Sequence, residues 1–156
     1  MQFFKPLRDI IKRTQELNID LVMRSLFDKE EDLKDLIIKL NTQDQLFEQG
    51  INSQSVTLES IGGKYSDVTI LFKQAENLPF NRITLFDTGA FYESFSVTYE
   101  MNGIVISADT IKDTGDLRER WGKDILGLTD ESISKLVFFI QPLIVEFIIE
   151  YITQDL

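Results

Sequence analysis

The segment that most constrains the fold of this 156-residue chain is a long apolar stretch near its C-terminus, residues 129–153. Thr129 precedes two acidic residues, a combination typical of a helix N-terminus. Polar or helix-breaking residues then recur at intervals of seven, four, four and three: Lys135, Pro142, Glu146, Glu150 and Thr153. The pattern predicts a long helix that is buried except for one narrow polar stripe. Because proline cannot donate a helical hydrogen bond, we expect the helix to be kinked or divided at Pro142.

An apolar surface this wide must pack under a sheet or take part in a subunit interface. Packing in the chain's own core is the favoured interpretation, and a share in an interface is the alternative. We expect no membrane contact, because Glu146 and Glu150 interrupt residues 136–152 before the roughly 18 uninterrupted apolar residues of a spanning helix are reached. No signal peptide is expected either, because residues 1–9 reach a proline and charges before any apolar run.

The N-terminal third of the chain also has helical periodicity. Pro6 suits a first helical turn, and either Asn18 or Asp20 suits the start of a second helix ending near Phe27. The charge run at residues 28–32 predicts a further helix start, because acidic residues are favourable in a first turn. Behind this run lies a stripe predicted to face the core, made of Leu33, Leu36, Ile37 and Leu40.

The middle of the chain has a different pattern. Residues 50–64 are rich in loop-forming types, with at most a short strand, and residues 65–73 suit either a strand or a short helix capped by Ser66. Residues 82–86 predict a strand. Asn102 and Gly103 are typical of a two-residue hairpin turn, so we expect strands at about 94–101 and 104–108.

Together these patterns predict an α+β fold in a single domain, residues 1–156. It comprises a helical part at 1–42, a loop and small antiparallel sheet at 43–110, and a helical part at 111–156 that begins with a short helix at 116–121 ending at Gly122. The long apolar helix is expected to pack across the sheet.

Composition narrows the function. The chain has no His and no Cys, which excludes Ser-His-Asp and Cys-His catalysis, Cys/His zinc sites, iron–sulfur clusters and disulfides. Its formal net charge is −10. The densest basic stretch, containing Lys5, Arg8, Lys12 and Arg13, lies on a mixed-charge helical segment, so we expect no specific nucleic-acid binding.

Two Asp-Thr-Gly triplets, Asp87-Thr88-Gly89 and Asp113-Thr114-Gly115, offer one route to carboxylate catalysis. Aspartic proteases use two Asp residues that share a proton, and the first triplet follows an apolar segment as in the retroviral enzymes. The triplets lie only 26 residues apart, and 35 residues separate Gly89 from the Ile125-Leu126-Gly127 that would be the second landmark. Asp-Thr-Gly is also a common turn sequence. A protease using Asp87 is therefore the alternative function, and a structural turn is favoured.

The remaining acidic residues suggest no sharper site. Asp109, Asp113, Asp116 and Glu119 are oxygen donors that a Ca²⁺ ion could use, but their spacing does not match the EF-hand loop. The sequence has neither a Walker phosphate loop nor a dinucleotide-binding glycine pattern. We therefore predict a solvated acidic loop, and no metal or cofactor.

Residues 45–97 contain an ordered series of short motifs. Gly50 lies in a loop, a Tyr-Ser-x-x-Thr-x-x-x-Lys element follows, then Pro79, and the series closes on Thr-Gly-x-Phe-x-x-Ser-Phe. The residues that carry the pattern are Tyr65, Ser66, Thr69, Lys73, Thr88, Gly89, Phe91, Ser94 and Phe95. This order and spacing resemble those of bacteriophage virion-morphogenesis and tail-completion proteins, the small head–tail connector or neck components. The aromatic form is most similar to proteins of phages and prophages of Bacteroides-type gut bacteria. The chain departs from the pattern at residues 53–55, where a usual glycine is replaced, and by an insertion before Tyr65.

The resemblance implies a structural protein with no catalytic residues. It implies a subunit that works in a ring with copies of itself and with other neck or tail proteins, in a virion assembled in the host bacterial cytoplasm. An acidic chain suits such a ring, because a negative channel lining repels DNA and lets it pass. A bacterial adaptor outside any phage context is a further interpretation of the same residues.

Overall fold

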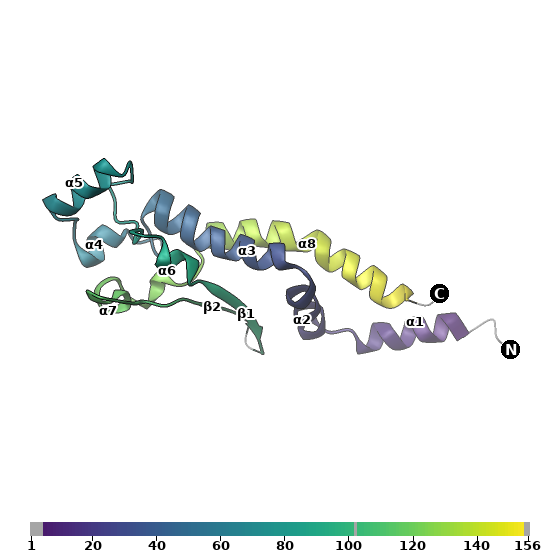
Figure 1. Cartoon of the computed structure of the whole chain (residues 1–156). Coiled ribbons are helices and arrows are strands. Elements are labelled where there is room, and N and C mark those ends of the chain that lie inside the picture. The colour runs from purple at the N-terminus through teal and green to yellow at the C-terminus, as the bar shows by residue number, and fades with distance from the viewer. Residues whose placement is uncertain (1–4, 102, 155–156) are drawn as a thin grey trace.

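A computed structural model describes residues 5–101 and 103–154, and it confirms an α+β fold rich in helix. The molecule is elongated, and both ends of the chain lie at its narrow end (Figure 1). The helices are α1 (Lys5–Glu16), α2 (Ile19–Lys29), α3 (Glu31–Lys39), the π-helix η1 (Leu40–Gln49), α4 (Leu58–Gly62), α5 (Asp67–Ala75), α6 (Ala90–Glu93), α7 (Leu117–Trp121), the short 3-10 helix η2 (Lys123–Ile125) and α8 (Asp130–Thr153). The strands are β1 (Ser96–Glu100), β2 (Gly103–Ser107), β3 (Ile111–Lys112) and β4 (Gly115–Asp116).

Side-chain caps fix the starts of several helices. Asn18 accepts a hydrogen bond from the Leu21 amide at 2.9 Å, so Asn18 rather than Asp20 caps α2. Ser66 accepts from the Thr69 amide at 3.2 Å, which settles residues 65–73 as a helix start rather than a strand. Thr129 caps α8. A polar side chain at this position satisfies an amide that the helix itself leaves unbonded.

The strands form two antiparallel hairpins. β1 pairs with β2, with Glu100 opposite Gly103, and the two-residue strands β3 and β4 form the second hairpin. The first hairpin was predicted at 94–101 and 104–108; β1 is shorter than predicted, because α6 and Ser94 occupy the chain up to residue 94, and β2 begins and ends one residue earlier than predicted. Asn102, part of the predicted turn, lies outside the described residues.

The predicted strand at residues 82–86 is wrong. This segment has no strand partner, because side chains bond to its backbone instead. The Tyr65 hydroxyl accepts from the Thr84 amide at 2.9 Å, and the Tyr92 hydroxyl donates to the Thr84 carbonyl. Thr84 is fully buried, so these bonds satisfy groups that water cannot reach.

The loop predicted at residues 50–64 contains a helix that the sequence did not reveal, α4. Before it, Ile51 pairs with Thr57 in an isolated antiparallel bridge. Buried Asn52 holds this turn, since its side-chain oxygen accepts from the amides of Gln54 and Val56, both at 3.0 Å.

Two hydrophobic clusters make the core, and both Ile38 and Ile106 pack against each of them. The first joins α2, α3 and α8 to Val97 of β1, and it includes three of the four residues of the predicted stripe as fully or nearly fully buried side chains, with Leu36 partly buried. The second lies at the broad end and is formed by Leu46, Leu58, Ile83, Phe91, Phe95, Trp121 and Ile125.

The prediction that α8 is buried except for a narrow stripe is wrong. Only Ser132, Leu136 and Ile140 of this helix are buried, because its packing partners, chiefly α1, α2 and α3, cover one side of it. The helix is also not divided at Pro142, which is exposed. By length and composition, the helical stretch Lys123–Thr153 is apolar enough to cross a membrane. Of the apolar segment within it, 17% is buried inside the protein.

Candidate functional site

The nine motif residues gather at the broad end of the molecule, where α5 lies against residues 82–95. Tyr65, Ser66, Thr69 and Lys73 come from α5 and the residues before it, and the other five come from α6 and its flanks. The structure therefore brings together residues that are up to 30 positions apart in the sequence.

Lys73 makes the central contact between the two sides. Its ammonium group donates to the Phe86 carbonyl at 2.6 Å and lies 4.9 Å from the centre of the Tyr65 ring. The residue is only 6% exposed, so the ammonium group depends on this carbonyl and on the face of the ring in place of water. Lys73 thereby fixes α5 against the turn that follows residue 86.

On the opposite side, the motif builds α6. Gly89 has φ +92° at the start of the helix, and the Thr88 hydroxyl accepts from the Ala90 amide at 3.4 Å. Ser94 donates to the Phe91 carbonyl at 2.7 Å and accepts from the Asp109 amide at 2.9 Å, which ties α6 to the chain after β2.

Phe91 and Phe95 meet edge to face in the second core cluster, with ring centres 5.1 Å apart. Each of the eight motif side chains thus caps, bonds or packs, and the ninth residue, Gly89, supplies the backbone conformation.

Tyr92 is a residue of this site that the motif missed. Its hydroxyl donates to Thr84, and burial raises the pKa of Tyr92 well above that of a solvated phenol. Arg82, also missed, donates from Nε to the Phe47 carbonyl at 2.8 Å and joins the segment to η1. No spacing in the sequence pointed to either, because their partners are backbone groups distant along the chain.

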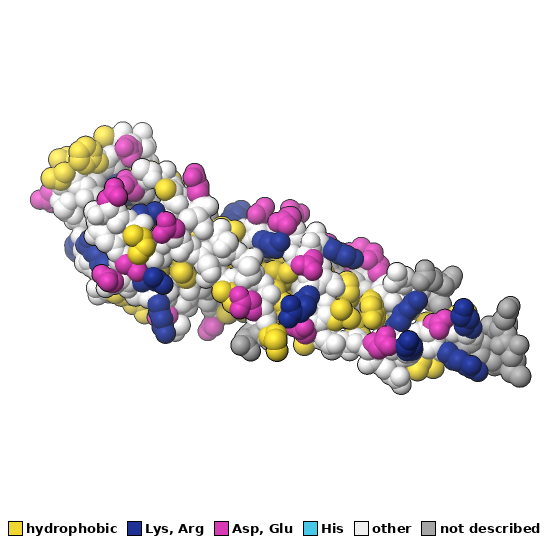
Figure 2. Space-filling view, turned by 60° about the horizontal axis from the view of Figure 1, so that its bottom comes forward, with side chains coloured by type: hydrophobic (Ala, Val, Ile, Leu, Met, Phe, Trp, Pro, Cys, Tyr) yellow, Lys and Arg dark blue, Asp and Glu magenta, His cyan; other side chains and the backbone are white. Residues whose placement is uncertain are grey.

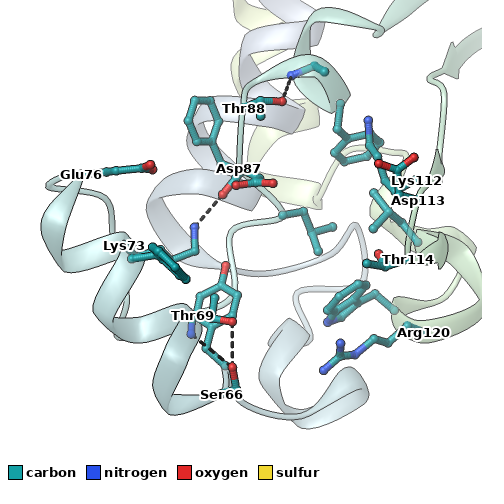
Figure 3. Close-up of a pocket in the computed structure, with 18 of the residues that line it drawn as sticks. Ser66, Thr69, Lys73, Glu76, Asp87, Thr88, Lys112, Asp113, Thr114 and Arg120 are labelled. Atoms are coloured by element: carbon teal, nitrogen blue, oxygen red, sulfur yellow. Dashed lines mark hydrogen bonds between the residues drawn. The ribbon is translucent and has the colours of Figure 1, made fainter.

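A cavity of about 1070 Å³ opens between α5, residues 85–91, the β3–β4 hairpin and α7. Both Asp-Thr-Gly triplets contribute to its lining, and Figure 3 draws Asp87 and Asp113 on different sides of it. Among the hydrogen bonds of the described residues, none joins these two carboxylates. The charged lining is mixed in sign: Lys64, Lys73, Glu76, Asp87, Lys112, Asp113 and Arg120.

Each triplet lies in a turn. Asp87-Thr88-Gly89 leads into α6, while Asp113 and Thr114 connect β3 to β4. Gly89 and Gly115 both have positive φ, +92° and +119°, which glycine adopts without steric cost. These positions agree with the turn interpretation of both triplets.

Two of the four acidic residues considered as cation ligands, Asp109 and Asp116, serve local structure. Asp109 accepts from the Ile111 amide at 3.0 Å. Asp116 caps α7 and pairs with Arg118 at 2.9 Å, and these hydrogen bonds from Arg118 lower the pKa of Asp116 to about 2. Within residues 5–101 and 103–154, no three Asp or Glu side chains gather closely enough to hold a metal ion.

Two buried amide side chains on η1 were also missed. Asn41 donates to the Ile125 carbonyl at 3.1 Å and accepts from the Gly127 amide at 2.9 Å. Gln45 donates to the Gly127 carbonyl and accepts from the Thr129 amide, both at 2.9 Å. Both side chains are fully buried, and together they fix the loop from which α8 starts.

Apolar side chains are left exposed on several elements, among them α5 and α8. On α5, Val68, Leu71 and Phe72 are 61–66% exposed, and Phe72 also lines the cavity; Figure 2 shows hydrophobic side chains gathered at that end of the molecule. On α8, Phe138 is 81% exposed, Val145 56% and Ile149 54%. Patches of this kind on a chain that is otherwise charged mark surfaces that are covered by something else.

No protein-family model matches the sequence, no curated protein is similar to it, and no solved structure matches its fold.

Proposed function

We propose that this chain is a structural subunit of a bacteriophage particle, a head–tail connector or tail-completion protein that works in a ring at the neck. The observation that carries the proposal is the exposed apolar surface of α8. The ordered motif of residues 65–95 supplies the phage context.

The outer seam of α8 consists of Phe138, Pro142, Val145, Ile149 and Ile152. These residues are spaced four, three, four and three apart, the period with which one helix packs along another. Phe138 is two residues from both Leu136 and Ile140, so the seam lies on the side of α8 opposite to its buried residues. It extends for about 21 Å along the helix. A seam of this length, with its first four residues exposed, is suited to a subunit contact.

The contacts of the motif residues support a structural role. They hold α5, the 82–86 segment and α6 together through caps, one buried ammonium group and an aromatic pair. A chain whose most distinctive residues are used for packing leaves few groups for chemistry. This is what a subunit requires if it must keep its shape inside a particle.

Charge supports the same proposal. With 26 acidic against 16 basic residues, the chain is strongly negative at neutral pH. A ring of such subunits repels DNA phosphates and does not arrest DNA that passes through it.

A second candidate function, an aspartic protease that uses Asp87, has one observation in its favour: both Asp-Thr-Gly triplets line the same cavity. The protease hypothesis predicts peptide cleavage at acidic pH that disappears in Asp87→Asn. Cleavage that persists in this variant, or no cleavage by the unmodified chain, ends the hypothesis.

The proposed function is tested by deleting the gene from the genome that encodes the chain and viewing the particles by electron microscopy. We expect DNA-filled heads and separate tails that are not joined, and joining restored by the gene supplied in trans. Particles of normal form after deletion contradict the proposal. The purified chain is examined in parallel, and we expect closed rings.

A further inference from the structure

Helix α1 has an exposed face that matches the outer seam of α8. No residue of α1 is buried, although Arg13 donates to the Gln154 carbonyl and Leu17 packs against the first core cluster. Leu7 and Ile11 are 52% and 50% exposed and lie four residues apart, on one side of the helix. The contacts within its own chain therefore leave the apolar side of α1 uncovered.

The charges of the two helices are complementary. α1 carries four basic and two acidic residues, whereas α8 carries four acidic residues and one basic residue. Figure 2 shows Lys and Arg side chains gathered at the α1 end of the molecule. The acidic residues of α8 would repel those of a second α8, whereas they attract the basic residues of α1.

The same short pattern is present on both helices with opposite charge. On α1, Leu7 and Ile11 are each followed by a basic residue, Arg8 and Lys12. On α8, Val145 and Ile149 are each followed by an acidic residue, Glu146 and Glu150. When two helices run antiparallel, the residues that follow the facing apolar pairs lie on the same side of the contact. Lys12 then lies beside Glu146, whereas Glu150 lies further round α8, at the hollow that Lys29, Phe147 and Tyr151 line.

We propose that α1 of one copy docks antiparallel on the outer seam of α8 of the next copy. This inference rests on the proposed function and specifies the contact between its subunits. Because the two surfaces differ, the contact is head to tail, and repetition gives a ring where the rotation closes. Lys12 already forms an exposed pair with Glu16 at 3.8 Å, which is weak enough to exchange for a new partner.

The test is a charge reversal with rescue, measured by light scattering on the size-separated full chain at low salt. We expect Arg8→Glu with Lys12→Glu to be monomeric, and Glu146→Lys to be monomeric as well. Mixing the two variants restores assembly, because each then meets a complementary surface on the other. The control variant, Lys64→Glu with Lys123→Glu, reverses two exposed basic residues outside α1 and α8 and assembles like the unmodified chain.

Assembly of Arg8→Glu with Lys12→Glu at the unmodified level overturns the inference and favours a contact between two α8 helices. A mixture that remains monomeric also overturns it, and so does co-sedimentation of the unassembled chain with phosphatidylcholine vesicles, which favours a lipid surface. If Arg8→Glu with Lys12→Glu assembles normally, the chain still self-assembles, and the proposed function is not contradicted. An unmodified chain that never assembles contradicts both.

Discussion

At the scale of single residues, Thr84 shows how a buried extended segment is stabilised outside a sheet. Its amide and carbonyl groups bond to the hydroxyls of Tyr65 and Tyr92, which stand where neighbouring strands would. Each tyrosine also packs its ring, so one side chain supplies both apolar area and a polar partner. The cost of losing one hydroxyl is high, because the backbone group left behind is buried.

Tyr92→Phe is accordingly expected to lower the free energy of unfolding by about 1–3 kcal/mol, since it leaves the Thr84 carbonyl without its donor. Urea denaturation followed by circular dichroism measures the change. Tyr151→Phe is the matched control, because that ring stacks on Phe147 and its hydroxyl has no hydrogen bond within the described residues. Equal effects of the two substitutions would contradict the role given to Tyr92.

The charge of Asp116 makes stability depend on pH. Its pKa is lowered to about 2 in the fold, from about 3.8 in an isolated group, by hydrogen bonds from Arg118. A carboxyl whose folded pKa is depressed stabilises the fold above its unfolded pKa, and this contribution is lost as the pH falls toward 2. Asp116→Asn keeps a side chain that can cap α7 but removes the charge.

We therefore expect the urea midpoint of Asp116→Asn to lie below that of the unmodified chain by a constant amount from pH 5 to 7. The difference should narrow as the pH falls below about 4. If the difference between the two urea midpoints stays constant down to pH 2.5, the charge of Asp116 does not contribute to stability.

At the scale of elements, the sequence predicted the helices whose signals are local. Asn18, Ser66 and Thr129 each cap a helix through an amide three residues further along the chain, so their neighbours alone identify them. The strand at residues 82–86 failed as a prediction because β-type residues indicate an extended backbone but not its partner. Nothing near Thr84 in the sequence indicates that two tyrosines, 19 and 8 residues away, bond to its backbone.

In the candidate site too, local signals could be read from the sequence and contacts between distant segments could not. The residues that the motif named on α5 and around α6 lie together in the structure. The cavity beside them depends on the β3–β4 hairpin and α7, which approach α5 only in the folded chain. The prediction that α8 is buried was wrong because periodicity gives the width of an apolar surface but not what covers it.

The π-helix η1 is the element that orients α8. A π-helix is usually a single turn within an α-helix, so one of ten residues is unusual. The side-chain amides of Asn41 and Gln45 each donate one hydrogen bond to, and accept one from, the backbone of residues 125–129. The direction of α8, and with it that of the outer seam, depends on these four hydrogen bonds.

Gln45→Ala should therefore cost roughly 2–4 kcal/mol of stability, because two buried backbone groups lose their partners. It should also speed hydrogen exchange at the Thr129 amide more than elsewhere in α8. Gln43→Ala is the control, since its side chain bonds only to exposed Glu48 and should change stability by about 0.5 kcal/mol or less. Unchanged exchange at Thr129 in Gln45→Ala would disprove the link between η1 and α8.

At the scale of the whole molecule, the apolar residues are unevenly distributed. The two core clusters fill the broad end and the centre, whereas α1 and the C-terminal half of α8 form a narrow extension in Figure 1, on which Leu7, Ile11, Val145 and Ile149 are at least half exposed. A single copy of the chain leaves this extension half covered. In the proposed contact a second copy covers the rest of this extension, and the elongated shape then serves a contact between neighbours.

The central claim is that the outer seam of α8 is a contact between copies, and the most direct measurement is the mass of the chain in solution as a function of its concentration. We expect the unmodified chain to form a defined oligomer. Phe138→Asp should remain a monomer of 18.1 kDa with unchanged circular dichroism, because this side chain is 81% exposed and has no role in the core. Met101→Asp places the same charge on an 86% exposed apolar residue of the hairpin and should assemble normally. An unmodified chain that is monomeric at every concentration, or a Phe138→Asp variant that assembles as well as Met101→Asp, would contradict the account.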